Sequence, residues 1–177
     1  VAEVEGAFGG IDILVNNAAL FTAAPIVEIT RADYDRIFAV NVSGPLFMMQ
    51  AVARGMIARG QGGKIINMAS QAGRRGEALV AVYCASKAAV ISLTQSAGLN
   101  LIAHGINVNA IAPGYIDTEM VGAMDPKVLE TIVGQIPVGR LGKGEEIADM
   151  VSWLVGERAG YVTGCTLSLN GGQYLVG

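Results

Sequence analysis

The stretch "KIINMAS", residues 64–70, decides the fold class of this sequence. It is a short apolar run that ends in a small polar residue, which is typical of a parallel strand covered on both faces. Three other runs share this character: "IDILVNN" (11–17), "INVNAIAPG" (106–114) and "CTLSLNGG" (165–172). The sequence therefore predicts four strands.

Stretches with helical periodicity separate these strands. Apolar residues recur at helical spacing over residues 31–58 and 82–104, and a third helix is predicted near residues 144–156. Strands that alternate with helices predict an α/β fold with a parallel sheet and right-handed crossovers. Residues 117–140 are less regular, and ligands of such sheets bind beyond the carboxyl ends of the strands. We therefore expect residues 117–140 to form a lid.

The composition limits the classes of partner. The 177 residues are 52% hydrophobic and 15% charged, which predicts a single domain over residues 1–177. Because the net charge is only -3 and the charges are scattered, we expect neither nucleic-acid binding nor a membrane-surface patch. No run of about eighteen apolar residues is present to span a bilayer. We expect a small-molecule partner, and the mean hydropathy of +0.47 predicts apolar contacts between subunits.

The cysteine and histidine content argues against metal and disulfide chemistry. Cys84 and Cys165 form neither a CxxC pair nor a disulfide framework, and His104 is the only histidine. We therefore expect no metal site and two reduced thiols. The start of the sequence lacks the charged-then-apolar layout of a secretory signal, which agrees with an expected cytoplasmic location.

The sequence "YCASK" contains the first candidate pair for catalysis. Tyr83 and Lys87 are four positions apart, so they share a face of the predicted helix. A neighbouring ammonium favours the phenolate and lowers the tyrosine pKa from its usual value of about 10. This spacing predicts an acid/base pair that works near neutral pH, with chance spacing as the alternative.

Polar residues at strand ends and inside a helix are further candidates. Ser70 ends the strand before the Tyr83 helix, where its hydroxyl can hold a carbonyl oxygen; an ordinary turn serine is an equal alternative. Asn41 lies in an otherwise apolar helix, where an amide needs a buried partner. Asn16 and Asn17 end the first strand. Structural hydrogen bonding is the default interpretation of all three asparagines.

Taken in order, these motifs resemble those of the short-chain dehydrogenase/reductase family. The matching features are "NNAA" (16–19) for N-N-A-G, Asn41 for the helix asparagine, "INMAS" (66–70) for the serine strand, "YCASK" for Y-x-x-x-K, "APGYIDTEM" (112–120) for the P-G segment and "LSLNGG" (167–172) for the V-D-G-G-like ending. The likeness extends over essentially the whole chain. Within the family, "FMMQAVARGMI" and "GLNLIAHGINVNAIAPG" are especially similar to the polyol (sorbitol and galactitol) dehydrogenases.

The resemblance implies a role for each matching residue. Tyr83 is the general acid in carbonyl reduction or the general base in alcohol oxidation, and Lys87 lowers its pKa and bonds the nicotinamide ribose. Ser70 orients the substrate oxygen, and Asn41 holds a water in the proton relay. The cofactor-binding positions implied by the resemblance are Asn17, Ala18, Tyr83, Lys87, Pro113, Gly114, Ile116 and Thr118. The implied fold is the C-terminal part of a Rossmann-like, doubly wound parallel sheet with about four strands.

The sequence departs from the family pattern most strongly at its start. It contains no T-G-x-x-x-G-x-G motif, and "EGAFGG" (5–10) follows helical residues instead. The resemblance therefore implies an N-terminally truncated member, without the backbone donors and the helix dipole that hold a pyrophosphate. We expect NAD, or NADP, to bind weakly or not at all; NAD is favoured because the polyol members use it. Ala19 and Asn170 replace a glycine and an aspartate of the pattern.

Three interpretations of function stay open. The first is an NAD(P)-dependent oxidoreductase that interconverts a secondary alcohol or polyol and a ketone, in which Glu77 can bond a polyol hydroxyl. The second is a catalytically inactive fragment that folds as an oligomeric module. The third is a 3-oxoacyl-acyl carrier protein reductase, for which only Arg74 and Arg75 offer a basic docking patch.

We also expect a homo-oligomer, either a dimer or a tetramer. The resemblance implies a dimer through the outer faces of the helices over residues 31–58 and 82–104. The strand over residues 11–17 becomes a sheet edge, and an apolar edge favours pairing with another chain. We expect this edge to be covered by another chain or by residues 1–8.

Overall fold

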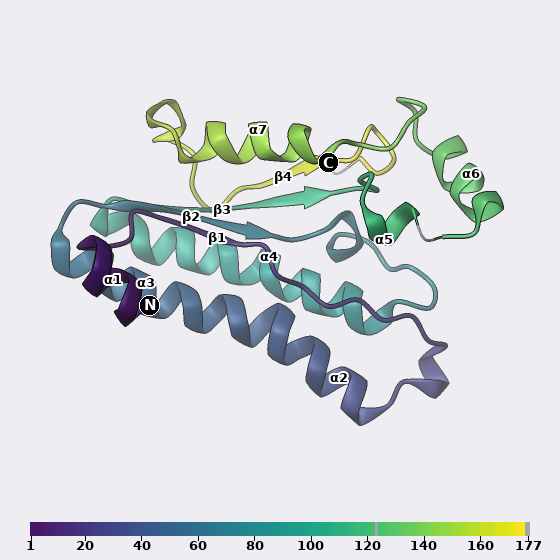
Figure 1. Ribbon diagram of the computed structural model, residues 1–177, viewed down its shortest axis with the longest axis horizontal. Coiled ribbons are helices and arrows are strands. Elements are labelled where there is room, and N and C mark those ends of the chain that lie inside the picture. Colours follow the sequence, from purple (N-terminus) through teal and green to yellow (C-terminus); the bar gives the residue numbers. More distant parts are fainter. Residues whose placement is uncertain (123, 176–177) are drawn as a thin grey trace.

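The computed structural model describes residues 1–122 and 124–175. A four-stranded parallel sheet with the strand order β1-β2-β3-β4 lies at its centre (Figure 1). The strands are β1 (Ile13–Asn16), β2 (Gly63–Met68), β3 (Ile106–Pro113) and β4 (Thr166–Leu169). Each strand overlaps one of the four predicted stretches, so the α/β, Rossmann-like parallel sheet is confirmed.

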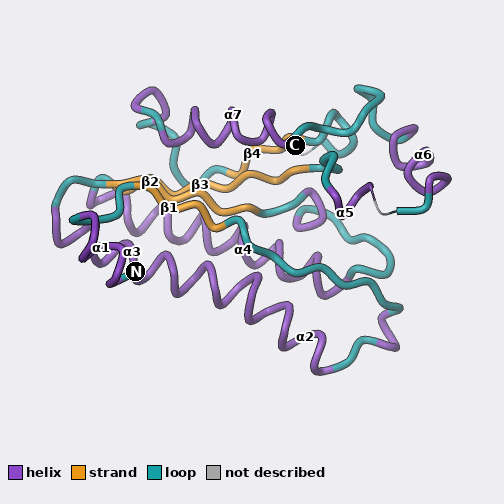
Figure 2. The backbone as a smooth tube through the Cα atoms, viewed as in Figure 1, coloured by secondary structure: helices purple, strands orange, loops and turns teal. Residues whose placement is uncertain are grey.

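Helices cover both faces of this sheet (Figure 2). The long helices α3 (Gly44–Arg59) and α4 (Ala81–Leu101) lie on one face, and α7 (Gly144–Val155) lies on the other. Helix α4 continues as a 3₁₀ turn (Ile102–His104), which ends at Gly105 with a left-handed φ of 72°. Among the described helices, none has both the length and the apolar character that crossing a bilayer requires.

The predicted helix over residues 31–58 is interrupted in the structure. Helix α2 (Arg31–Phe38) is followed by a π-helical turn (Ala39–Ser43), and only then does α3 begin. Pro45 has no N–H to donate to the carbonyl of Asn41, so a regular α-helical bond is impossible at this point. The wider turn places Asn41 in the interior, with 1% of its surface exposed.

Residues 117–140 are more regular than predicted. They contain α5 (Glu119–Gly122) and α6 (Pro126–Gly134). The side chain of Asp125 accepts a hydrogen bond of 2.8 Å from the Lys127 amide, and Pro126 occupies the first turn of α6. An acidic N-cap followed by proline is a helix start signal, so this segment, expected to be the less regular part of the chain, contains two short helices that were not predicted.

Two apolar layers join the helices to the sheet. On the side of α3 and α4, Val52, Met56 and Val108 belong to one buried cluster. On the side of α7, Leu154 packs with Ile66 of β2 and Ile111 of β3. Neighbouring residues of the central strands therefore point to opposite covered faces, as expected of a buried parallel sheet.

Strand β1 forms one edge of the sheet. It pairs only with β2 among the described residues, and Ile13 and Val15 are 48% and 40% exposed. Helix α1 (Ala2–Phe8) adds no strand to this edge, and Val1, just before it, packs against the cluster that includes α3. We expected residues 1–8 or another chain to cover this edge; within this chain, residues 1–8 add no strand to it and leave Ile13 and Val15 exposed.

Candidate active site

The sequence-predicted residues gather at the carboxyl ends of β2 and β3. A cavity of about 450 Å³ opens there, and its wall includes Ser70, Tyr83, Gly114, Ile116 and Thr118. Ser70 follows β2, Gly114 follows β3 and Tyr83 lies in the first turn of α4. This is the edge at which open α/β sheets bind their ligands.

Lys87 lies one helical turn after Tyr83 and is almost completely buried. It is 3% exposed, and its Nζ donates a hydrogen bond of 2.8 Å to the carbonyl oxygen of Met68 at the end of β2. The same Nζ lies 5.6 Å from the centroid of the Tyr83 ring. Burial lowers the pKa of Lys87 from 10.5 to about 8, because the charged ammonium is poorly solvated there.

The expected lowering of the Tyr83 pKa is not found. Burial raises this pKa above the usual tyrosine value, a side-chain hydrogen bond with Ser70 acts in the opposite direction, and the charge of Glu77 adds to the increase. The Lys87 ammonium is directed at the Met68 carbonyl and is itself desolvated, so it does not dominate the environment of the phenol. Phe21 packs edge-on against the Tyr83 ring with 5.1 Å between the centroids.

Ser70 combines the two interpretations that its sequence position allowed. It caps the 3₁₀ turn Gln71–Gly73, where its Oγ accepts a hydrogen bond of 3.2 Å from the Ala72 amide. It also lines the cavity beside Tyr83. A hydroxyl has one donor and two acceptor sites. The Ala72 bond occupies one acceptor site, so the Ser70 O–H, which bonds Tyr83, can instead turn to a further oxygen in the cavity.

Both the nitrogen and the oxygen of the Asn41 side-chain amide form hydrogen bonds within the protein. Its Nδ2 donates to the Leu20 carbonyl at 2.9 Å and to Ser86 Oγ at 3.1 Å, and its Oδ1 accepts from the Leu20 amide at 2.7 Å. Ser86 Oγ in turn donates to the Tyr83 carbonyl at 2.7 Å. Asn41 thus connects the segment after β1 to the first turn of α4. Both of its side-chain N–H groups are engaged, and a water-holding role stays a prediction.

The predicted cofactor-binding residues divide into two groups. Gly114, Ile116 and Thr118 share the cavity wall with Tyr83. Asn17 and Ala18 follow β1 in exposed positions, and Pro113 ends β3 without belonging to that wall. A Cβ atom on Gly114 would lie 2.8 Å from the Cβ of Asn170, so this position requires glycine and presents bare backbone.

The cavity wall also includes residues that the sequence did not indicate. Gln71, Leu79 and Tyr115 line it, and Leu79 has a left-handed φ of 67°, which is unusual for a bulky residue. The Leu79 carbonyl accepts a hydrogen bond of 2.7 Å from the Ala24 amide. Gln71 follows Ser70 directly, and that adjacency is the only signal that could have identified it. Leu79 carries no comparable signal, because its backbone conformation depends on the fold.

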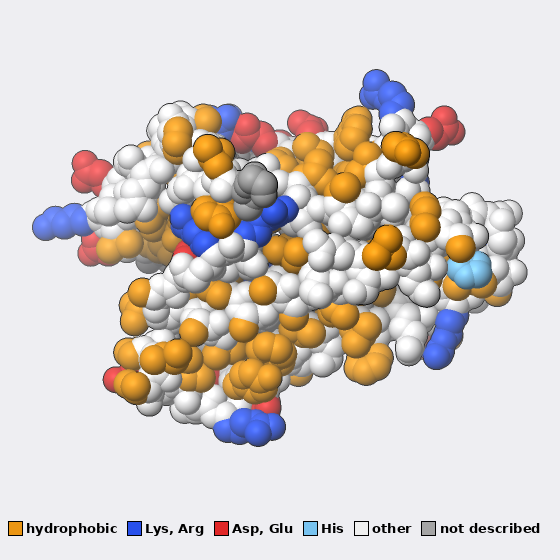
Figure 3. All heavy atoms as spheres, turned by 180° about the vertical axis from the view of Figure 1, so that it is seen from behind, with side chains coloured by type: hydrophobic (Ala, Val, Ile, Leu, Met, Phe, Trp, Pro, Cys, Tyr) orange, Lys and Arg blue, Asp and Glu red, His pale blue; other side chains and the backbone are white. Residues whose placement is uncertain are grey.

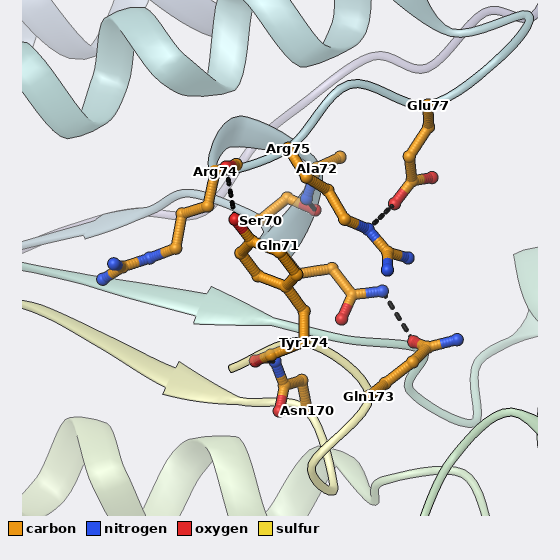
Figure 4. A network of polar contacts seen from close by, with 9 residues as sticks. All are labelled: Ser70, Gln71, Ala72, Arg74, Arg75, Glu77, Asn170, Gln173 and Tyr174. Atoms are coloured by element: carbon orange, nitrogen blue, oxygen red, sulfur yellow. Dashed lines mark hydrogen bonds and ion pairs between the residues drawn. The ribbon is translucent and has the colours of Figure 1, made fainter. Parts of the chain in front are cut away.

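Arg74 and Arg75, the two candidates for a basic docking patch, both bind partners within the chain. The Arg74 guanidinium donates to the Thr166 carbonyl of β4. Arg75 forms an ion pair of 2.8 Å with Glu77, and both side chains are less than a third exposed (Figure 4). The two arginines therefore point to partners within the chain, so they offer little of the exposed basic patch that the carrier-protein alternative requires.

The sequence and the structure are similar to those of known dehydrogenases and reductases over nearly the whole chain. Residues 1–173 match the family described as "Enoyl-(Acyl carrier protein) reductase". Sorbitol dehydrogenase of Cereibacter sphaeroides is 60% identical over 99% of this chain and 73% of its own length. Galactitol 2-dehydrogenase of Agrobacterium fabrum is 50% identical over the same shares. A crystal structure with bound NADP, of an Agrobacterium tumefaciens protein described as a 2-deoxy-D-gluconate 3-dehydrogenase, superimposes with a TM-score of 0.91 at 39% identity, covering 96% of this chain and 71% of that one.

Proposed function

This chain belongs to the short-chain dehydrogenase/reductase family, and from that premise we propose that it is an NAD(P)-dependent oxidoreductase acting on a secondary alcohol or polyol and the corresponding ketone. One observation carries the proposal. The hydroxyl groups of Ser70 and Tyr83 meet in one cavity wall, and the buried Lys87 lies behind them.

The two hydroxyl groups would handle the reacting oxygen. In carbonyl reduction the Tyr83 phenol gives its proton to that oxygen, and in alcohol oxidation the phenolate takes the proton back. Burial raises the pKa of Tyr83, so the protonated phenol required for reduction is the resting form. Ser70 donates a hydrogen bond to the same oxygen and orients it. Lys87, with a pKa of about 8, can exchange protons close to neutral pH.

The cavity fits the nicotinamide end of a dinucleotide. Gly114 presents bare backbone, because Asn170 leaves no room for a side chain, and Ile116 and Thr118 continue the same wall. These residues would hold the nicotinamide beside Tyr83. When bound, the nicotinamide supplies or accepts the hydride.

A polyol is the substrate class that the observations favour. The relatives that share 60% and 50% of the sequence are named as dehydrogenases of sorbitol and galactitol. In this chain, the Glu77 carboxylate lies in the cavity wall and can accept a hydrogen bond from a second hydroxyl of the substrate. A carrier-protein substrate has less support, because Arg74 and Arg75 are engaged with Thr166 and Glu77.

The test is turnover by the purified chain. Sorbitol and galactitol are offered with NAD and with NADP, and the corresponding ketoses with the reduced cofactors, while nicotinamide absorbance is followed. We expect slow turnover with at least one polyol, and its loss in Tyr83→Phe. A folded chain that shows no turnover at saturating cofactor would instead support a module without catalytic activity.

A further inference from the structure

The last described residues of the chain pack against the segment that carries Ser70 (Figure 4). Gln173 Oε1 accepts a hydrogen bond of 2.7 Å from the side-chain Nε2 of Gln71. The Tyr174 hydroxyl donates a bond of 3.0 Å to the Arg74 carbonyl. The partners are 102 and 100 positions apart in the sequence, so these contacts exist only in the folded chain.

Tyr174 is also connected to the cavity wall, through Arg75 and Glu77. The Arg75 guanidinium lies over the Tyr174 ring, 5.5 Å from its centroid, and pairs with Glu77 at 2.8 Å. An aromatic face attracts a guanidinium and limits its positions. Because Glu77 lines the cavity, these two contacts connect Tyr174 to a residue of the cavity wall through Arg75.

Residues 170–174, which we call the tail, are fixed by hydrogen bonds of Asn170. Asn170 Nδ2 donates to the Tyr174 carbonyl at 2.6 Å, and Asn170 Oδ1 accepts from the Gly172 amide at 3.1 Å. Asn170 also packs against Gly114 at the end of β3. The tail is thus a fixed turn after β4, and it can serve as a support for a neighbouring segment.

Gln71 depends on this support. It is 3% exposed, and its Oε1 has no hydrogen-bond partner among the described residues, so Gln173 provides the only side-chain bond that it makes. Loss of that bond would leave a buried amide without any partner, which folded proteins avoid. The segment would then shift to find water or another partner.

We propose that Gln173 and Tyr174 are positioning residues, which fix residues 70–77 so that the Ser70 hydroxyl and the Glu77 carboxylate keep their places in the cavity wall. Neither residue lines the cavity, and both act through Gln71, Arg74 and Arg75.

Limited proteolysis tests this proposal without any need for activity. Trypsin cleaves after Arg75, and cleavage requires the segment to open. We expect Gln173→Ala and Tyr174→Ala to speed cleavage after Arg75 by about fivefold or more relative to cleavage after Lys127. Tyr174→Phe keeps the ring beneath Arg75 and should have a smaller effect. Tyr161→Ala removes an exposed ring elsewhere and serves as the matched control.

Mass spectrometry of the fragments decides between the outcomes. A selective increase after Arg75 supports local positioning. An unchanged rate, or an equal increase after Arg75 and Lys127, would overturn it, because the second pattern reports general loss of stability.

Steady-state kinetics test whether this positioning also affects catalysis. This second test rests on the proposed function. Gln71 adjoins Ser70, so Gln173→Ala should lower kcat about tenfold with a smaller change in KM. Tyr174→Ala releases Arg75 and Glu77 and should mainly raise KM, by about fivefold. Leu175→Ala, in an exposed neighbour, should change neither. Unchanged kinetics in both variants would overturn the catalytic part. A wild-type chain without turnover would contradict the proposed function, and the trypsin result would still decide the positioning.

Discussion

At the scale of single residues, the Tyr83 phenol is the group on which turnover should depend most. Tyr83→Phe keeps the ring that packs against Phe21 and removes the hydroxyl group, and with it the exchangeable proton. We expect kcat to fall by about 10²- to 10⁴-fold, which is the usual contribution of a positioned acid or base. Steady-state kinetics of Tyr83→Phe would measure this, with Tyr161→Phe as the control. An undiminished kcat in Tyr83→Phe would show that another group transfers the proton.

The buried Lys87 should make stability depend on pH in a defined direction. Its pKa is about 8 in the folded chain and about 10.5 in an ordinary environment. Between these values the unfolded chain binds more protons, so the free energy of unfolding rises with pH in this window. Below about pH 8 the ammonium is charged in both states and its burial opposes folding.

Lys87→Met removes this titration and is the comparison to make. The free energy of unfolding of the wild type, relative to Lys87→Met, should rise by about 2 kcal/mol between about pH 8 and about pH 10. Urea unfolding at several pH values within that window would measure it. A difference that stays constant or falls with pH would contradict a depressed Lys87 pKa.

At the scale of elements, the amide of Asn41 joins two segments that meet at the site. Asn41→Ala removes its bonds to Leu20 and Ser86 and leaves their backbone and hydroxyl groups buried without that partner. We expect the free energy of unfolding to fall by about 2 to 4 kcal/mol. Denaturant unfolding would measure the loss, with Ala58→Gly at the exposed end of α3 as a control for helix effects. A loss below about 1 kcal/mol would show that the π-helical turn does not rely on these bonds.

Some elements of the fold could be predicted from the sequence, and others could not. The strands were predictable because each lies in a short, mostly apolar run that ends in small or polar residues, as "KIINMAS" does. The π-helical turn was not predicted, because it depends on the combination of Pro45 with an amide whose partners lie elsewhere in the chain. The site divides in the same way. Ser70, Tyr83 and Lys87 follow local spacing, whereas the place of Gln173 beside Gln71 arises only when β2 and β4 end at the same edge.

At the scale of the whole molecule, the first question is how tightly the 177-residue chain binds its cofactor. In the proposed function, Gly114, Ile116 and Thr118 of the cavity wall would hold the nicotinamide, but the sequence contains no glycine-rich turn before a helix that would hold the pyrophosphate. We predict a dissociation constant on the order of 100 µM or weaker for NAD(H) and NADP(H). Isothermal titration calorimetry would measure it. A low-micromolar constant with one site per chain would require pyrophosphate donors from another segment or subunit.

The second whole-molecule prediction is that the chain forms a homo-oligomer. Hydrophobic side chains form several separate patches on the reverse face of the molecule (Figure 3). Helices α3 and α4 form an apolar groove whose wall includes Leu46, Ile57 and Leu101, and both Leu46 and Ile57 are 38% exposed. Burying such surface against a second copy removes apolar area from water and is favourable.

The groove gives this prediction a selective test. The double variant Leu46→Glu/Ile57→Glu places two charges on α3 in the predicted interface. Both positions are partly exposed in the single chain, so the charges stay outside its buried core. We expect light scattering to find a dimer or tetramer for the wild type at micromolar concentration and a monomer for the double variant. Val128→Glu, at an exposed position on α6, should keep the wild-type mass. A monomeric wild type would contradict the prediction outright. An oligomer that survives the double variant would move the interface away from α3 and α4, and the open edge of β1 would then be the next surface to substitute.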